Sequence, residues 1–366
     1  MRLAIFAQIV VLILAVVVAS GSCAGVKPTR SSEVIELSYS NFFPPTHLNS
    51  VLAERFCREV EQRTNGRVRI THYPGGSLTP AAGVYEGVVK GISDIGMSCL
   101  AYTMGRFPAS EIVDLPHGYP SGWVATKVAN DFYRKFKPKE FDDVQVLYFH
   151  AHGPGVLFTT KKPVRKLEDL RGLVIRSTGV GAKIVEALGA KGYGASQGEA
   201  YELMSKGTID GSFTPREVLK GWKQAEVVKY VTLCYDVGNT TDMFVVINKA
   251  KWEGFPSDVK KVFLDVSEEW VEKHGMVWTY YDKVAIEYFL SFPERVLIEL
   301  SANEMARWVR AAQPLIDEYI QQKSAMGLPA KEYHDYLVAR VKYWSEKAPS
   351  DEFCVNWVEK ELVTTK

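Results

Sequence analysis

The chain has 366 residues, of which 46% are hydrophobic, and its 44 Lys and Arg residues nearly balance its 43 Asp and Glu residues. This length exceeds the roughly 250–300 residues at which single hydrophobic cores stop growing, so two domains are expected. The net charge of +1 and the lack of a long basic run argue against a nucleic-acid partner, because nucleic acids are held by many phosphate contacts.

The first segment of the chain differs from everything after it. The basic residue Arg2 precedes an almost wholly apolar run from Leu3 to Ala19, and small residues follow up to Gly25. This pattern is typical of a secretory signal, so we predict that residues 1–24 are a cleaved signal peptide and that the protein acts in the periplasm. An uncleaved membrane anchor, which needs about 20 apolar residues, and a lipid on Cys23 are the less favoured alternatives.

Strand and helix patterns alternate after this segment. Val34 to Ser40 alternates apolar and polar residues as a strand does, and Leu48 to Thr64 has the apolar spacing of a helix. A strand at Val68 to Tyr73, a helix around Ala82 to Lys90 and a strand at Asp94 to Ser98 follow. Such alternation predicts parallel strands with helices on both faces.

A similar unit recurs in the second half, where Val144 to Ala151 and Leu173 to Arg176 are predicted strands. Residues 179–181, Gly-Val-Gly, open a predicted helix but lack the third glycine of a dinucleotide fingerprint, so we interpret them as helix-entry geometry. His150 and His152 lie on one face of the first strand. A strand end that leads into a hinge is favoured over a metal site there, because no third ligand is evident nearby.

The longest helical pattern runs from Ser257 to about Phe289 without a proline. Its apolar residues recur mostly at gaps of three, four and seven, as on one face of a helix. At 1.5 Å per residue such a helix is about 45 Å long, more than the width of one small domain. We therefore predict that it crosses from one domain to the other, with Gly275 as a point where it bends.

Arg176 is the strongest candidate for a binding residue. It ends a strand and precedes a helix N-terminus, and ligands of open α/β sheets bind outside the carboxyl ends of the strands. Its guanidinium can hold a carboxylate through two parallel hydrogen bonds, beside the positive potential of the helix N-terminus. From the residues alone, an ion pair between Arg176 and a neighbouring Asp or Glu is an equal alternative.

The segment that ends in Arg176 resembles a family motif. Residues 168–176, Glu-Asp-Leu-Arg-Gly-Leu-Val-Ile-Arg, are similar to the Asp-Leu-Lys-Gly-x-x-Ile-Arg motif of DctP-type solute-binding proteins of tripartite ATP-independent periplasmic (TRAP) transporters. Further matches follow in order along the chain, at residues 64–68, 73–78, 89–95, 199–203, 207–211, 228–230 and 248–252. The resemblance covers about residues 34–290.

The resemblance implies a two-domain α/β periplasmic binding protein with mixed or parallel sheets, helices on both faces and a long interdomain hinge helix. We assign residues 34–154 plus 242–280 to domain I and residues 155–241 plus 290–366 to domain II. The helix 257–289 spans both domains, which would close together on a ligand.

The resemblance also implies the binding residues. Arg176 would hold the substrate carboxylate, and the other pocket positions fall at or near Phe42, Phe43, Ser98, Cys99, Gln197 and Thr214. The aromatic residues Phe42, Phe43, Tyr102 and Phe213 suggest an apolar or aromatic monocarboxylate, with core packing as their alternative role. Leu157 and Thr214 stand where the sialic-acid branch of the family has arginine and asparagine, which argues against a sialic acid.

These observations predict a binding protein with no catalytic activity, no metal and no other cofactor. It would capture a small organic carboxylate by hinge closure and deliver it to the integral membrane permease subunits of a TRAP transporter. An exported α/β enzyme acting on organic acids and a ligand-sensing receptor module are the alternatives; phosphate-loop, Gly-x-Ser-x-Gly and His-Glu-x-x-His signatures are absent from the sequence. The cysteines at 57, 99, 234 and 354 match no zinc or redox motif, and we interpret them as isolated buried thiols.

Overall fold

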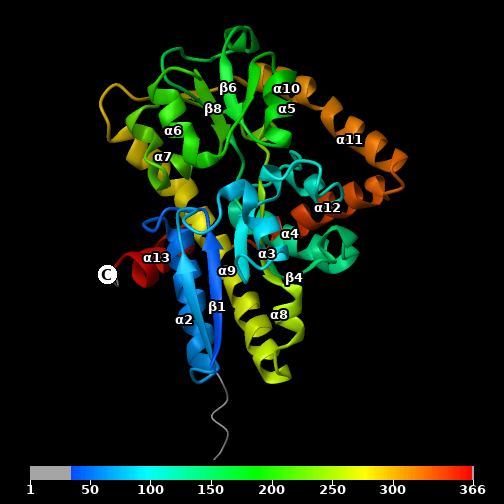
Figure 1. Cartoon of the computed structure of the whole chain (residues 1–366). Helices are drawn as coiled ribbons and strands as arrows, with labels where there is room; N and C mark the ends of the chain where they lie inside the picture. Colours follow the sequence, from blue (N-terminus) through cyan, green and yellow to red (C-terminus); the bar gives the residue numbers. More distant parts are fainter. Residues whose placement is uncertain (1–33, 365–366) are drawn as a thin grey trace, which may run out of the picture. The chain divides into compact units, whose positions relative to one another are not determined.

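A computed structural model describes residues 34–364 of the chain (Figure 1). The predicted signal peptide, residues 1–24, lies outside the described residues. Residues 35–366 belong to one compact unit, and its described part contains two β-sheets. Among the described residues, no helix combines the length and the apolar character needed to span a bilayer.

The first sheet has the strand order β2-β1-β3-β10-β4. Its strands are β1 (Ile35–Asn41), β2 (Val68–Tyr73), β3 (Ile95–Cys99), β4 (Val144–Ala151) and β10 (Asp242–Asn248). Strand β1 pairs in parallel with β2 and β3, as the alternation of strands and helices predicts. Strand β10 runs antiparallel to both β3 and β4, so the sheet is mixed.

The second sheet has the order β11-β9-β5-β8-β6-β7. Its strands are β5 (Val156–Thr159), β6 (Val174–Ser177), β7 (Lys191–Gly194), β8 (Gly211–Thr214), β9 (Tyr230–Leu233) and β11 (Val296–Glu299). Strands β8, β6 and β7 are parallel, whereas β5 runs antiparallel to β8 and β9. The carboxyl ends of β6 and β8, which carry Arg176 and Thr214, therefore lie at the same edge of this sheet.

Helices cover both sheets (Figure 1). The helices that pack on strands of the first sheet are α2 (Leu48–Arg63), α3 (Val84–Val89), α4 (Gly122–Phe136) and α8 (Lys249–Glu253). Those beside the second sheet are α5 (Val180–Ala187), α6 (Gln197–Ser205) and α7 (Val218–Gly221). The predicted α/β class with helices on both faces is confirmed.

Gly179 is the N-cap of α5 and has a φ of 51°. A Cβ at this position would lie 2.9 Å from Cβ of Ala101, and one at Gly181 would lie 2.3 Å from Oγ of Ser177. Both glycines are therefore required by close packing at the start of the helix, which supports their interpretation as helix-entry geometry.

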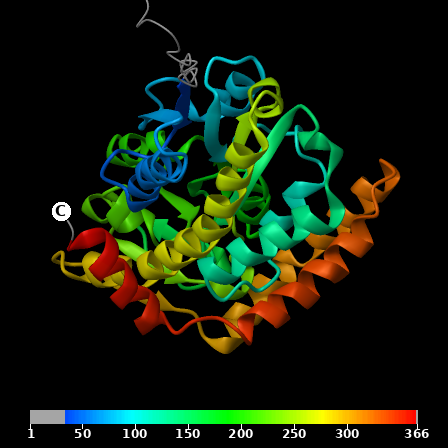
Figure 2. The ribbon, with the colours of Figure 1, turned by 90° about the horizontal axis from the view of Figure 1, so that it is seen from below.

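The long helix α9 (Ser257–Leu290) has 34 residues and confirms the predicted helix to within one residue at its end. At 1.5 Å per residue it is about 50 Å long. It packs on α2, α4 and β4 beside the first sheet and on α7 beside the second, and Figure 2 shows it crossing the view diagonally. Gly275, predicted as a bend, faces Trp123 of α4, where an added Cβ would lie 2.9 Å from Cδ1 of the indole.

Two further segments connect the sheets and lie side by side. Residues 151–156 lead from β4 to β5, residues 237–242 lead into β10, and the N–H of Gly155 donates to the carbonyl of Asn239 at 2.9 Å. Asp282 of α9 lies directly against Gly153, where an added Cβ would be 2.0 Å from Oδ2. The three connections between the sheets therefore meet at one place.

The C-terminal helices are α10 (Ala302–Ala312), α11 (Pro314–Ala325), α12 (Ala330–Ser345) and α13 (Asp351–Val358). The predicted domain II includes all of residues 290–366, and α10 does pack on α5. Helices α12 and α13 differ from this grouping, because α12 packs on α4 and α13 on α9. Arg340 Nε and Trp344 Nε1 both donate to Oδ2 of Asp131 on α4, at 2.7 Å, and fasten α12 there. The division into two domains stays a prediction.

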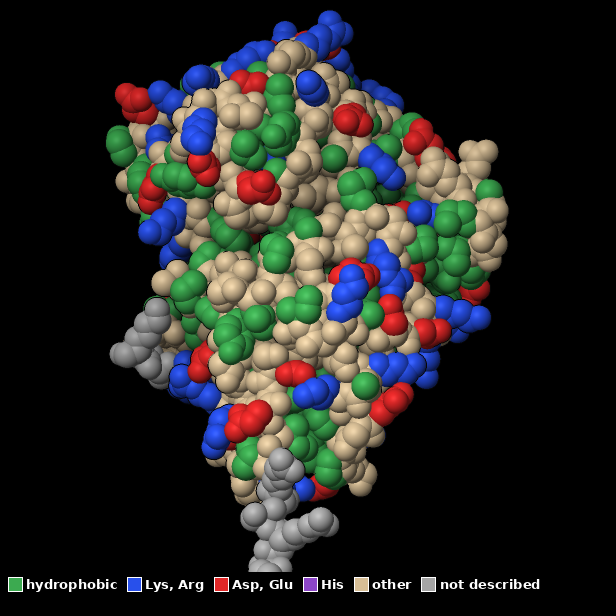
Figure 3. All heavy atoms as spheres, viewed as in Figure 1, with side chains coloured by type: hydrophobic (Ala, Val, Ile, Leu, Met, Phe, Trp, Pro, Cys, Tyr) green, Lys and Arg blue, Asp and Glu red, His purple; other side chains and the backbone are tan. Residues whose placement is uncertain are grey.

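The four cysteines of the described residues, at 57, 99, 234 and 354, are buried and unpaired, which confirms their interpretation as isolated thiols. The surface is of mixed charge: over most of the face in Figure 3, Lys and Arg side chains are interspersed with Asp and Glu.

Candidate functional site

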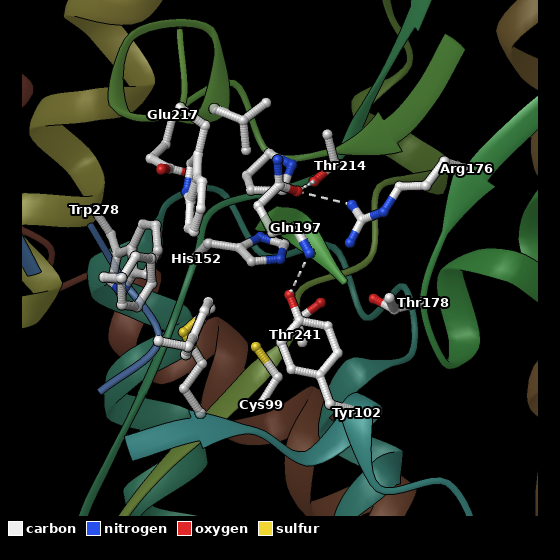
Figure 4. Close-up of a pocket in the computed structure, with 16 residues that line it drawn as sticks. Cys99, Tyr102, His152, Arg176, Thr178, Gln197, Thr214, Glu217, Thr241 and Trp278 are labelled. Atoms are coloured by element: carbon white, nitrogen blue, oxygen red, sulfur yellow. Dashed lines mark hydrogen bonds between the residues drawn. The ribbon is translucent and has the colours of Figure 1, made fainter. Parts of the chain in front are cut away.

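A pocket lies where the three connections between the sheets meet (Figure 4). It contains about 340 Å³ of empty space, including part that is open to solvent. Its walls come from both sheets, with Tyr102 following β3 and Arg176 on β6, from the connecting segments through His152 and Thr241, and from α9 through Trp278. A molecule held here therefore lies against the two connecting segments and the long helix.

Seven of the nine predicted binding residues line this pocket: Phe42, Phe43, Cys99, Tyr102, Arg176, Gln197 and Thr214. Ser98 and Phe213 do not line it. Ser98 Oγ donates to the carbonyl of Ala81 at 2.6 Å, and the Phe213 ring is packed in the core. Each precedes a lining residue on a strand, and neighbouring residues of a strand point to opposite faces of the sheet.

Arg176 is held in a fixed orientation near the end of β6, with 2% of its surface exposed. Its Nε and Nη2 donate to the carbonyl of Ala195 at 3.0 and 2.8 Å, and Nη1 donates to Oε1 of Gln197 at 2.8 Å. A guanidinium has five N–H donors, so these contacts leave two of them for other acceptors.

The charge of Arg176 has no carboxylate partner, since no Asp or Glu between residues 34 and 364 forms an ion pair with it. Burial lowers the pKa of Arg176, and the nearby Tyr102 and Cys99 act in the opposite direction. Buried charges in proteins are normally paired, so an unpaired buried cation in a pocket favours an anionic ligand. The alternative role, an ion pair with a neighbouring acidic residue, is not what the structure shows.

Gln197 adds a second donor beside Arg176. It is the first residue of α6, whose start is fixed by a capping box between Ser196 and Glu199. Its Oε1 accepts from Arg176 and, at 3.4 Å, from Oγ1 of Thr214, while the buried Nε2 has no partner among the described residues. The amide NH₂ of Gln197 is therefore available to a ligand oxygen.

Tyr102 joins the two sides of the pocket. Its hydroxyl oxygen accepts the backbone N–H of Gln197 at 3.0 Å, although Tyr102 follows β3 of the first sheet and Gln197 lies beside the second. Burial raises the pKa of Tyr102, so its phenol stays neutral and keeps a proton to donate.

The two histidines of β4 have different surroundings. His150 is buried, stacks on His274 with ring centroids 4.1 Å apart, and accepts from Nε1 of Trp278 at 3.1 Å. His152 lines the pocket, and burial lowers its pKa to about 4. Its Nδ1 donates to the carbonyl of Gly153 at 2.6 Å, so Nε2 keeps its lone pair. Within the described part of the chain, no group of three or more His, Cys, Asp or Glu side chains could hold a metal ion.

The sequence analysis does not predict several of the residues that line the pocket. The lining residues not predicted as ligand contacts are His152, Thr178, Pro215, Glu217, Val218, Trp222, Thr241, Met243 and Trp278. Trp278 is recognisable in the sequence as an apolar position of the long helix. Glu217 and Trp222 flank the four-residue helix α7, which is too short to produce a periodic pattern.

The comparisons with known proteins place the chain in a family. Residues 39–323 match bacterial extracellular solute-binding protein family 7, DctP. A TRAP periplasmic solute-binding protein of Desulfovibrio salexigens is 33% identical, and the alignment covers 87% of this chain and 99% of that one, with a TM-score of 0.75. A TRAP periplasmic solute-binding protein of Bordetella bronchiseptica, with bound (R)- and (S)-mandelate, is 27% identical, with coverages of 85% and 99% and a TM-score of 0.78.

The alignment with a curated relative covers a smaller share of both chains. The monocarboxylate 2-oxoacid-binding periplasmic protein of a Nostoc strain is 25% identical over 225 residues, which are 59% of this chain and 61% of that protein. The match therefore spans less than two thirds of that relative. The family match extends over most of the chain and includes both sheets and the pocket, and the chain belongs to the DctP family of bacterial extracellular solute-binding proteins.

Proposed function

We propose that the protein captures a small organic monocarboxylate in the periplasm and passes it unchanged to the membrane permease of a TRAP transporter. The observation that carries this proposal is the buried guanidinium of Arg176, which faces the pocket without an acidic partner among the described residues. A ligand carboxylate would supply the missing negative charge and accept the two N–H groups that Arg176 has left.

The lining supports an apolar or aromatic acid. Phe42, Trp222, Met243 and Trp278 form much of the wall away from Arg176. Phe42 and Trp222 are stacked, with ring centroids 6.2 Å apart. Such a wall binds a ring or an apolar chain and offers little to a polyhydroxylated sugar acid. The mandelate complex of the Bordetella relative and the 2-oxoacid specificity named for the Nostoc relative fit this class of ligand.

Capture by closure is supported by the residues that surround the pocket. Tyr102 and Gln197, from opposite sides, are hydrogen-bonded to each other beside Arg176. A ligand enclosed between them would be shielded from water, which strengthens its ion pair with Arg176. The meeting of the three connections next to the pocket supports a hinge at this place.

The side chains of the pocket support binding rather than catalysis. Burial raises the pKa of Cys99, so its thiol is a poor nucleophile. The hydroxyl of Thr214 donates to the amide oxygen of Gln197, not to a base. These contacts do not form the nucleophile–base pair that an acid-processing enzyme would need.

Substitution of Arg176 tests the proposal by isothermal titration calorimetry with benzoate and mandelate. Arg176→Ala should weaken binding by about 2–5 kcal/mol, because the ligand carboxylate would be buried without a partner. Arg176→Lys should recover part of the loss, since an ammonium keeps the charge but not the planar fork. The acid should be recovered unchanged after incubation.

Arg295 provides the matched control. Its Nε and Nη2 donate to the carbonyl of Ala225 at 3.1 and 2.9 Å, the same arrangement as at Arg176, but it does not line the pocket. Arg295→Ala should bind as the wild type does. If Arg176→Ala binds within about threefold of wild type, roughly 0.7 kcal/mol, the carboxylate is held elsewhere and the site assignment is wrong.

A further inference from the structure

The pocket has a second polar end, opposite Arg176. Figure 4 shows Glu217 on the far side of the pocket from Arg176, with His152 and Gln197 between them. Glu217 immediately precedes α7 and Trp222 immediately follows it, and both line the pocket. Glu217 is 1% exposed, so its carboxylate is buried in the protein rather than dissolved in solvent.

Only one oxygen of Glu217 is engaged by the protein. Nδ1 of His47 accepts the backbone N–H of Asn49 at 3.1 Å, so the ring proton of a neutral His47 is on Nε2. That Nε2–H donates to Oε1 of Glu217 at 2.5 Å. Oε2 has no hydrogen-bond partner among the described residues, and it can accept a hydrogen bond from a ligand.

Trp222 supplies a free donor at the same end. Its indole ring lies 6.1 Å from the His47 ring and 5.9 Å from the Phe43 ring, centroid to centroid, so it is held next to the His47–Glu217 pair. Nε1 of Trp222 is buried and has no acceptor within residues 34–364. A buried donor without an acceptor is costly, and a ligand oxygen would remove that cost.

A hydroxyl group is the ligand group that matches both partners, because it donates one hydrogen bond and accepts others. An ammonium would satisfy Glu217 but could not accept from Trp222. A second carboxylate would accept from Trp222 but would be repelled by Glu217. An unsubstituted apolar end would leave both protein groups unpaired.

We propose that the ligand is an aromatic or similarly apolar monocarboxylate that carries a hydroxyl group at the end away from its carboxylate, and that Glu217 and Trp222 select it. The inference rests on the proposed function, because it places the carboxylate at Arg176. Between the two ends, the side chains of Phe42, Met243 and Trp278 offer an apolar passage suited to a ring.

The first test compares four acids on the wild-type protein by isothermal titration calorimetry: benzoate, 3-hydroxybenzoate, 4-hydroxybenzoate and isophthalate. At least one hydroxybenzoate should bind about tenfold or more tightly than benzoate, because a site built to hydrogen-bond a hydroxyl strongly rejects the analogue that lacks it. Isophthalate, with a second carboxylate, should bind more weakly than benzoate because Glu217 repels it.

Two conservative variants assign the preference to its residues. Trp222→Phe keeps an aromatic ring and removes the donor, so the ratio of hydroxybenzoate affinity to benzoate affinity, measured on the same variant, should fall to about threefold or less. Glu217→Gln keeps the shape and removes the charge. The ratio of the isophthalate Kd to the benzoate Kd should therefore fall by about tenfold.

The outcomes separate this inference from the proposed function. If benzoate binds in an Arg176-dependent manner and neither hydroxybenzoate is favoured, the hydroxyl inference is overturned and the proposed function stands. If no acid of the set binds, both the aromatic class and the hydroxyl inference are wrong. The comparison on the wild-type protein needs no variant, so it decides the matter even if Trp222→Phe or Glu217→Gln does not fold.

Discussion

Two arginines stand near the carboxyl ends of neighbouring strands, Arg176 buried and Arg216 partly buried, and they differ in whether an acidic residue neutralises their charge. Arg216, two residues after β8, forms an ion pair with Asp282 of α9, at 3.2 Å between Nη2 and Oδ2. It also donates from Nη1 to the hydroxyl of Tyr235 at 3.2 Å. The guanidinium of Arg176 on β6 donates to a carbonyl and an amide oxygen, and no acidic residue between residues 34 and 364 forms an ion pair with it.

The pKa values reflect this difference. Burial lowers the pKa of Arg216, but Asp282 and Tyr235 outweigh burial, so the pKa is raised. Burial also lowers the pKa of Arg176, and there no carboxylate reverses the effect. The fold therefore neutralises one arginine internally, where it fastens the segment after β8 to the long helix, and leaves the other unpaired in the pocket. Charge pairing thus distinguishes Arg216, which the fold neutralises, from Arg176, which we propose binds the ligand.

The largest effect is expected from removing Arg216, the arginine that we interpret as structural. Arg216→Ala would leave Asp282, 6% exposed, as an unpaired buried charge, and should lower the free energy of unfolding by about 3–5 kcal/mol. Urea unfolding followed by circular dichroism measures the loss. The double variant Arg216→Ala with Asp282→Asn should recover part of it, because the orphaned charge is gone. A loss of less than about 1 kcal/mol for Arg216→Ala would show that the pair is not structural.

Acidification sharpens the comparison, because it removes the charge of the partner. Burial raises the pKa of Asp282 to about 6, against the opposing effect of Arg216. Between pH 7 and 5 the folded state takes up this proton more readily than the unfolded chain, so this group adds stability as pH falls. Burial lowers the pKa of His117 and His152 to about 4 and that of His274 to about 3. In that window the unfolded chain binds those protons more readily, so the histidines remove stability as pH falls.

Each of these histidines removes about 2 kcal/mol of stability over that range, whereas the buried carboxyls of Asp114 and Asp242, whose pKa values burial raises, act in the same direction as Asp282. Asp282 offsets about 1 kcal/mol of the loss. The variant Asp282→Asn cannot take up the proton, so its stability relative to that of the wild type, measured by urea unfolding, should be about 1 kcal/mol lower at pH 5 than at pH 7. Equal changes in the two proteins would show that Asp282 does not titrate in this range.

The smallest expected effect concerns Arg176 in the absence of ligand. Arg176→Ala removes hydrogen bonds to Ala195 and Gln197 but also removes an unpaired buried charge. These effects oppose each other, so the free energy of unfolding should change by less than about 1 kcal/mol. Urea unfolding without ligand measures this change beside that of Arg216→Ala. A loss similar to the loss for Arg216→Ala would mean that both arginines are structural.

The sequence predicts local elements well because their patterns are local. The apolar spacing of the long helix and the alternation in Val34–Ser40 match α9 and β1 closely. The antiparallel insertion of β10 beside β3 and β4 depends on pairing between distant segments, which no local pattern contains. The packing of α12 on α4 likewise depends on Asp131, an unremarkable polar position until Arg340 and Trp344 are brought to it.

The sequence predicts where the candidate site lies but not every residue that lines it. The family motif and the strand end identify Arg176, and family positions lead to the pocket at Cys99 and Thr214. These signals do not determine which of two successive residues faces the pocket, so the prediction includes Ser98 and Phe213, whose side chains point elsewhere. The sequence does not indicate Glu217 as a pocket residue, because Glu217 is held by His47, which is 170 positions away in the chain. Trp222 lies beside this pair, and no local pattern predicts that contact either.

The buried thiols of the four cysteines open a practical route to watching the protein work. Burial raises the pKa of Cys234 and Cys354 to about 12, and Cys57 and Cys99 are shifted in the same direction. Thiols in this state react slowly with maleimides. Engineered surface cysteines, one beside each sheet, could therefore carry a dye pair with little background labelling. Energy transfer between the dyes would then report, in single molecules, whether ligand changes the distance between the two sheets.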